Sequence, residues 1–206
     1  SEADFRTLWH QAIPNLNTAE SPKVTVRPVE FKIPKWLEYR AGDYAHQGDA
    51  VDAWRASEWR GILEMCTGSG KTLTAMVGAH ELHRQVGSLL VVVTAPYNVL
   101  IHQWCDEIAQ FGLRPINMSS CPGSKGRGKE IAQARRRLSM NITPLEIVVV
   151  SNDTLVSSEF QSQIGTIDGP KLLIADECHN LGSAGFVESP PEMFDYRLGL
   201  SATPVR

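Results

Sequence analysis

Short apolar runs alternate with longer segments of helical periodicity along most of the chain. The apolar runs have the length and β-branched content of buried strands, and they cover residues 61–65, 89–95, 147–151, 172–175 and 198–201. Between the first two runs, apolar residues recur at helical spacing up to Gly87, and a later helical pattern stops at Gly112. This alternation predicts βαβ units, and therefore an α/β fold with a mainly parallel central sheet flanked by helices.

Three stretches depart from the alternation. Prolines at positions 14, 22, 28 and 34 exclude a long helix at the start of the chain, although residues 24–31 have strand character. We therefore predict an N-terminal extension over residues 1–40 and a main domain over 41–206. Glycines interrupt a basic segment between Arg114 and Arg137 and predict a loosened chain there, while residues 181–191 have the composition of a loop.

Composition and charge narrow the class of protein. Of the 206 residues, 42% are hydrophobic, which is enough for one well-buried core, and no apolar run approaches the length of a membrane span. A signal-peptide pattern is absent, and the four cysteines form no CxxC pair, so we expect no zinc site and a reducing, cytoplasmic location. The net charge of −3 argues against a module that binds nucleic acid through bulk positive charge, but it allows a local basic track.

The clearest chemical signal is a glycine-rich loop between the strand at 61–65 and the helix that follows. Its residues are Thr67, Gly68, Ser69, Gly70, Lys71 and Thr72. Glycines let the backbone fold closely around phosphates, and the N-terminus of the next helix adds partial positive charge. We expect Lys71 to reach the β- and γ-phosphates of a nucleotide and the Thr72 hydroxyl to bind Mg²⁺. The pattern G-x-x-x-x-G-K-T is broken only at its first position, where Met65 stands.

An acidic pair follows a second apolar run. Asp176 and Glu177 come directly after the strand predicted at 172–175. Because the carboxyl ends of parallel strands share one edge of the sheet, this pair is expected to face the phosphate loop. Asp176 would then hold Mg²⁺ and Glu177 would polarise the attacking water. Without the upstream loop, an Asp-Glu pair after a strand is typical of a solvated turn.

These motifs resemble, in order and separation, those of superfamily 2 helicases and translocases. Residues 67–72, 176–179 and 201–203 resemble motifs I, II and III, and residues 94–96 followed by Gln103-Trp104 resemble motif Ia. Gln47 resembles the Q-motif glutamine that reads the adenine edge, although His46 stands where a tyrosine often precedes it. The spelling Asp-Glu-Cys-His is most similar to the helicase subunits of type III restriction enzymes.

The resemblance covers roughly residues 42–206 and implies a RecA-like ATP-binding domain that moves on nucleic acid, on DNA rather than RNA. It implies ATP and Mg²⁺ as cofactors and a role in restriction, defence or repair. In the family, residues matching His179, Ser201 and Thr203 couple the nucleotide site to the strand-binding surface. The positions matched to nucleic-acid contacts are Thr94, Pro96, Gln103, Asn152 and Thr154. Ser201 and Thr203 can equally do no more than end a strand.

The basic segment that starts at Arg114 has two interpretations. Its cations outnumber its one acid, Glu130, and glycine-rich flanks would let them follow a phosphate backbone. The cations are Arg114, Lys125, Arg127, Lys129, Arg135, Arg136 and Arg137. A solvated basic helix face explains the same composition. Trp9, Trp36 and Trp59 are assigned to packing.

Two other functions stay open at this point: a P-loop kinase and a nucleotide-gated binding module without motor activity. The kinase offers no reason for Asp-Glu-x-His and Ser-Ala-Thr to occur together. The sequence ends at Arg206, and we expect motifs IV to VI and the second RecA-like domain, which normally supplies an arginine to the site, to lie beyond it. We therefore expect weak ATP hydrolysis by this chain alone, and we expect its partners to be that second domain and nuclease or other defence subunits, with no membrane partner.

Overall fold

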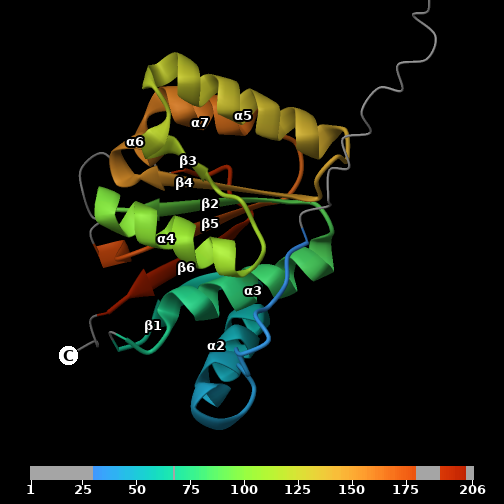
Figure 1. The fold of residues 1–206 in the computed structure, drawn as a ribbon, viewed down its shortest axis with the longest axis vertical. Helices are drawn as coiled ribbons and strands as arrows, with labels where there is room; N and C mark the ends of the chain where they lie inside the picture. The colour runs from blue at the N-terminus through green and yellow to red at the C-terminus, as the bar shows by residue number, and fades with distance from the viewer. Residues whose placement is uncertain (1–29, 67, 180–190, 203–206) are drawn as a thin grey trace, which may run out of the picture.

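The computed structural model describes residues 30–66, 68–179 and 191–202. Its centre is a six-stranded sheet in the order β1-β6-β5-β2-β4-β3 (Figure 1). The strands are β1 (Arg60–Glu64), β2 (Leu89–Ala95), β3 (Ile116–Asn117), β4 (Leu145–Ser151), β5 (Lys171–Ala175) and β6 (Tyr196–Ser201). Every neighbouring pair is parallel. The α/β fold with a mainly parallel sheet is therefore confirmed, and each of the five predicted strands is present to within two residues.

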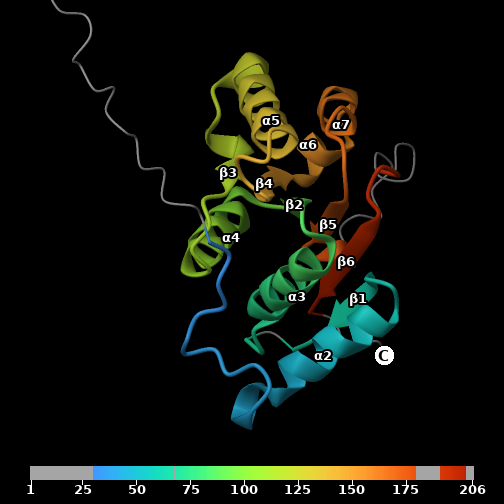
Figure 2. The same ribbon diagram turned by 90° about the vertical axis from the view of Figure 1, so that its right-hand side faces the viewer.

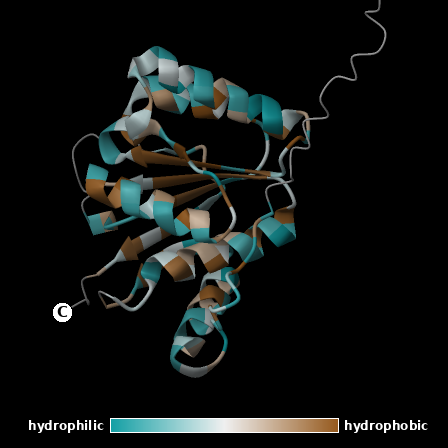
Figure 3. Cartoon of the chain, viewed as in Figure 1, coloured by the Kyte–Doolittle hydropathy of each residue, from teal (hydrophilic) through white to brown (hydrophobic). Residues whose placement is uncertain are grey.

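Helices cover both faces of the sheet (Figure 2). One face carries α2 (Ala45–Ala56), α3 (Lys71–Val86) and α4 (Asn98–Gln110), and the other carries α5 (Gly123–Ser139), α6 (Asn152–Val156) and α7 (Ser158–Gly165). Two short 3₁₀ turns, η1 (Gly42–Tyr44) and η2 (Met118–Ser120), complete the described elements. Along β2, Val91 and Val93 pack on the α3 side while Leu90 and Val92 pack on the α5 side, so this strand is buried on both faces. Figure 3 shows the resulting apolar strands between helices whose outer turns are hydrophilic.

The basic segment is a helix, which corrects the prediction of a loosened chain. The 17 residues of α5 include Gly126 and Gly128, and a buried stripe of Ile131, Ala134 and Leu138 fixes the helix on the sheet. A side chain at Gly128 would come within 3.1 Å of Gln163 on α7, so this glycine permits close helix packing. Tertiary burial thus outweighs the low helix propensity of glycine.

The described part of the predicted N-terminal extension crosses the α3–α4 face. Phe31 and Leu37 are buried in the same core cluster as that face, and the Lys32 N–H donates to the carbonyl oxygen of Phe111. Trp36, assigned to packing from the sequence, is instead 53% exposed, whereas Trp59 is buried as expected. Trp9 and most of the predicted strand at 24–31 lie outside the described residues, as does the predicted loop at 181–191 except for Pro191.

A search of the described residues for a membrane-spanning helix found no candidate.

Candidate active site

The glycine-rich loop connects β1 to α3 at the carboxyl edge of the sheet. Gly68 and Gly70 have φ angles of +82° and +83°, values that glycine adopts at little cost. Gly70 is the N-cap of α3, and no side chain caps that helix. The first N–H groups of α3 are therefore left for an external acceptor, the arrangement that binds phosphate. Thr67 lies outside the described residues.

Lys71 turns back over this loop. Its ammonium donates to the carbonyl oxygens of Met65 at 3.1 Å and Cys66 at 3.4 Å. The Ser69 hydroxyl also donates to the Cys66 carbonyl, at 2.6 Å. The loop therefore holds its lysine at the helix N-terminus, close to where phosphate oxygens would meet the open N–H groups.

Gln47 on α2 lies directly against the loop. Its side chain is fully buried, and its amide nitrogen is 3.5 Å from the Ser69 carbonyl oxygen. Among the described residues, no donor reaches its Oε1 atom. A buried acceptor without a partner beside a phosphate loop fits a ligand that donates a hydrogen bond, as an adenine amino group does.

Asp176 and Glu177 lie across a cavity from the loop. The cavity has a volume of about 450 Å³, and its lining includes Gly68, Gly70, Lys71, Thr72, Asp176 and Glu177. Asp176 is 9% exposed; its backbone N–H donates to the Thr94 carbonyl of the neighbouring strand, which fixes it at the sheet edge. The structure thus brings both predicted motifs into one cavity.

The side chains present suit Mg²⁺. Thr72 and Asp176 offer a hydroxyl and a carboxylate, the hard oxygen ligands that this ion prefers. Within the described residues no cluster of three or more His, Cys, Asp or Glu side chains has metal-site geometry. Mg²⁺ in nucleotide sites is commonly held by one or two protein oxygens, with phosphate and water completing its shell.

The predicted coupling residues lie beside this cavity. His179 Nδ1 is 3.4 Å from Glu177 Oε2. The Ser201 carbonyl accepts from the Met65 N–H at 3.3 Å, so the end of β6 adjoins the start of the phosphate loop. Cys178 packs on Gly199 of β6, and burial raises the pKa of its thiol. Thr203 lies outside the described residues.

The residues matched to nucleic-acid contacts do not share one surface. Thr94 is fully buried, and its hydroxyl donates to Asn152 Oδ1 at 2.7 Å. This hydrogen bond joins the end of β2 to the residue that follows β4, the strand that pairs with β2. Gln103 lines the phosphate cavity, where it donates to Glu107 at 3.1 Å. Pro96 is half-buried, and the hydroxyl of Thr154 bonds that of Ser151 at the start of α6.

The basic residues of α5 are divided between two edges of the sheet. The helix runs the length of the sheet in Figure 1, starting at the carboxyl edge. Arg127 near its start lines a hollow with Thr154, whereas Arg135 near its end lines another with Ser88, which precedes β2. Arg137 makes a paired contact with Glu146, at 2.6 and 2.9 Å, and is therefore a structural residue.

Sequence analysis did not predict the part that Trp36, Trp104 and Glu107 have in or beside this cavity. Trp36 and Glu107 line the cavity, and the Trp104 indole donates to Asp176 Oδ2 at 2.9 Å. Burial raises the pKa of the Glu107 carboxyl, the Gln103 hydrogen bond opposes this, and the nearby charge of Asp176 raises it further. The i, i+4 spacing of Gln103 and Glu107 places these two residues on one side of α4, whereas no sequence signal indicated the contact of Trp104 with Asp176.

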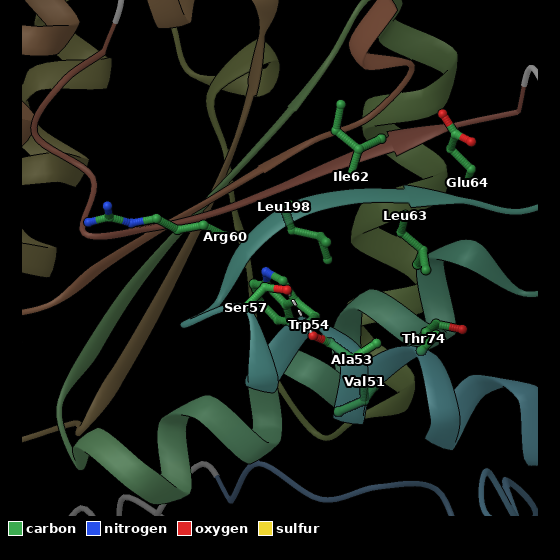
Figure 4. A pocket seen from close by; sticks show the side chains of 12 residues that line it. Val51, Ala53, Trp54, Ser57, Arg60, Ile62, Leu63, Glu64, Thr74 and Leu198 are labelled. Carbon is green, nitrogen blue, oxygen red and sulfur yellow. Dashed lines mark hydrogen bonds between the residues drawn. The ribbon is translucent and has the colours of Figure 1, made fainter. Parts of the chain in front are cut away.

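A second cavity, of about 300 Å³, lies between α2 and β1 (Figure 4). Val51, Trp54, Leu63 and Leu198 give it an apolar wall, and its lining includes none of the phosphate-loop residues 68–72. It therefore lacks the glycine-rich loop and the open helix end, and the cavity at the carboxyl edge of the sheet is the candidate site.

Comparisons with known proteins agree with this geometry. A family model described as "Type III restriction enzyme, res subunit" matches residues 41–206. The Pyrococcus furiosus Hef helicase domain is 22% identical, with a TM-score of 0.59, over 78% of this chain and 33% of that one. A nuclease-deletion mutant of the Type ISP restriction-modification enzyme LlaGI, in complex with a DNA substrate mimic, is 20% identical with a TM-score of 0.60, over 77% and 17%.

A third structure, the Sulfolobus solfataricus SWI2/SNF2 ATPase core in complex with dsDNA, is 16% identical with a TM-score of 0.54, over 85% of this chain and 34% of that one. At these identities the likeness shows the fold. The chain spans about a third or less of the length of these three structures. No curated protein sequence matches the chain.

Proposed function

The chain belongs to the family of type III restriction enzyme res subunits, and from that premise we propose that it is the ATP-binding motor domain of a DNA translocase or helicase. The observation that carries the proposal is the cavity shared by the uncapped N-terminus of α3, Lys71 and the Asp176–Glu177 pair. Lys71 and the helix N-terminus follow β1, and the two carboxylates follow β5. A cation, backbone N–H donors and carboxylates are the groups that phosphoryl transfer requires.

Each residue of the cavity has a distinct part in this proposal. Gly68, Ser69, Gly70 and the open N–H groups of α3 cradle the phosphates, with Thr67 completing the loop in the sequence motif. Lys71 exchanges its two loop carbonyls for phosphate oxygens and offsets the negative charge that develops on them. Glu177 orients the attacking water and accepts its proton. Gln47 accepts from the base.

Thr72 and Asp176 would hold Mg²⁺, which supplies further neutralisation of the phosphates when bound. His179 and Ser201, with Thr203 in the sequence motif, are the proposed link from this site to nucleic acid. We propose that the nucleic acid is DNA and contacts the carboxyl edge near Pro96, Asn152 and Thr154. A second RecA-like domain and nuclease or other defence subunits are the proposed partners, and 41–206 is the proposed motor domain.

Calorimetric titration with ATP and Mg²⁺ tests the proposal. We expect the wild-type chain to bind the nucleotide and Lys71→Ala to bind it at least about tenfold more weakly, because a charge-assisted contact to phosphate is lost. Lys129→Ala, which removes an exposed lysine of α5, is the matched control and should bind normally. Equal affinity of the wild-type and Lys71→Ala chains would refute the assignment of the loop.

A further inference from the structure

Both carboxylate oxygens of Asp176 are held by donors of this chain. The Trp104 indole N–H donates to Oδ2 at 2.9 Å, and the Glu177 backbone N–H donates to Oδ1, also at 2.9 Å. Together the two bonds fix the rotation of the carboxylate about its last torsion. The lone pairs that remain on each oxygen are then directed by the protein rather than by solvent, because Asp176 is 9% exposed and Trp104 is 1% exposed.

The Trp104 bond differs from those of the other buried indoles. Trp54 donates to the carbonyl oxygen of Arg197, and Trp59 donates to the side-chain amide of Gln85. Both of these acceptors are neutral, whereas Trp104 donates to a carboxylate. Hydrogen bonds to charged groups are about twice as strong as neutral ones, so this bond is the one of the three that can orient a functional group firmly.

The position of Trp104 is set by α4. Ile101 and Ile108 are fully buried on this helix and anchor it against the sheet, while Gln103 and Glu107 line the phosphate cavity. Two turns before Trp104, the helix begins next to Tyr97, which is 65% exposed at the carboxyl edge. A shift of this rigid helix would therefore move the donor that holds Asp176.

We propose that Trp104 is a positioning residue for Asp176 and makes the orientation of that carboxylate depend on the position of α4. The inference rests on the proposed function, in which Asp176 holds Mg²⁺. Trp104 is buried and does not line the cavity, so it acts through Asp176 and not on the nucleotide. Its effect is confined to the contribution of Mg²⁺ to nucleotide binding.

The test compares nucleotide affinity with and without Mg²⁺ by calorimetry, using a slowly hydrolysed ATP analogue. Trp104→Phe keeps an aromatic ring but removes the N–H donor. We expect its affinity without Mg²⁺ to match the wild type and the gain produced by Mg²⁺ to shrink about tenfold, the size of one hydrogen bond to a charged group. Trp59→Phe is the matched control, since it removes a buried indole donor from a neutral acceptor, and it should keep the full gain.

A full Mg²⁺ gain in a folded Trp104→Phe variant would overturn the proposal. An equal loss of affinity with and without Mg²⁺ would overturn it too, because that is the result of a general packing defect. Failure of the wild-type chain to bind the analogue in either condition would instead refute the proposed function on which the inference depends.

A second measurement uses the unmodified chain and does not depend on folding of the variant. In a ¹⁵N spectrum, addition of Mg²⁺ to the nucleotide-bound chain should shift the Trp104 indole signal, because its acceptor changes electronic environment. The Trp59 indole signal should stay in place. A Trp104 signal as unresponsive as that of Trp59 would contradict the proposal.

Discussion

Replacing Gly70 by alanine places a methyl group where the phosphate loop has no room for one. A Cβ atom at this position would lie 2.4 Å from the side-chain nitrogen of Gln47, which is fully buried. The backbone φ is +83°, so the substitution also imposes a left-handed conformation on a residue with a side chain. Gly68 has almost the same φ, +82°, and nothing within 4 Å of its Cβ position. Gly68→Ala therefore pays the conformational cost without the collision.

These two costs give the expected magnitude. A left-handed conformation costs an alanine about 1–2 kcal/mol. The overlap with Gln47 adds about 1–3 kcal/mol, the usual cost of overpacking, because the buried amide must leave its position. We therefore expect Gly68→Ala to lower the free energy of unfolding by about 1–2 kcal/mol and Gly70→Ala by about 2–5 kcal/mol.

Urea denaturation of five chains checks this reasoning: the wild type, Gly68→Ala, Gly70→Ala, Gln47→Ala and the double variant of Gly70 and Gln47. Removing the Gln47 side chain leaves space for the added methyl group, so the two changes should be non-additive by about 1–3 kcal/mol in the direction of rescue. Additive effects, or a Gly70→Ala variant no less stable than Gly68→Ala, would show that Gln47 does not press on the loop. The same variants titrated with nucleotide should show that the double variant regains stability but not affinity.

Three further predictions follow from the remaining polar contacts. Arg137→Ala leaves the Glu146 carboxylate, which is 7% exposed, without its cation and with only the Thr143 hydroxyl as donor; this should destabilise the chain by about 2 kcal/mol in urea denaturation without changing the salt dependence of DNA binding. Three cations lie near the start of α5: Lys125, Arg127 and Lys129. Replacing them by alanine should reduce the slope of log affinity against log salt by about 0.9 per lost phosphate contact. The double alanine variant of Arg135 and Arg136 should leave that slope unchanged. Burial lowers the pKa of both His80 and His83. At His80 the charge of Glu81 partly opposes this shift, whereas the charge of Arg84 lowers the pKa further. The unfolded chain therefore binds protons first, so stability should fall as pH drops below about 6.5, and the double His→Gln variant should lose less stability over that interval.

The centre of the sheet was predictable because β2, β4 and β5 are buried along almost their whole length. Runs such as β2 and β5 are apolar almost throughout, so their assignment does not depend on an alternation of apolar and polar residues. The ends of α3 and α4 were predictable too, because Gly87 and Gly112, both with positive φ, follow them as expected. The strand β3 was missed because it has two residues and no apolar run. Its place in the sheet is fixed by pairing with β4, a contact that local sequence does not encode.

The candidate site was predictable where motif and strand end coincide, and not where a residue reaches it from another element. Asp176 and Lys71 are both given by sequence position relative to a strand. Trp36 reaches the cavity because residues 30–40 cross the α3–α4 face, and Trp104 reaches Asp176 through the packing of α4. Both facts depend on tertiary structure. The burial of Thr94 has the same origin, since the position of β2 in the sheet decides whether a strand end is exposed.

The basic residues that lie close together in the sequence between 123 and 139 are separated in space by the length of α5. At 1.5 Å per residue, the 17 residues of α5 span about 25 Å, so the cations at its two ends cannot serve one phosphate track across a single edge of the sheet. Arg137 is engaged with Glu146, and Arg135 lies at the amino edge near Ser88. Only the cations at the start of the helix lie at the edge that carries Thr154 and the phosphate loop. A nucleic acid bound there would also meet the exposed Tyr97 at the start of α4, and α4 carries the indole that holds Asp176. Contact at that edge and orientation of the carboxylate are therefore joined by one rigid element, which is the physical requirement for nucleic acid to influence the nucleotide site.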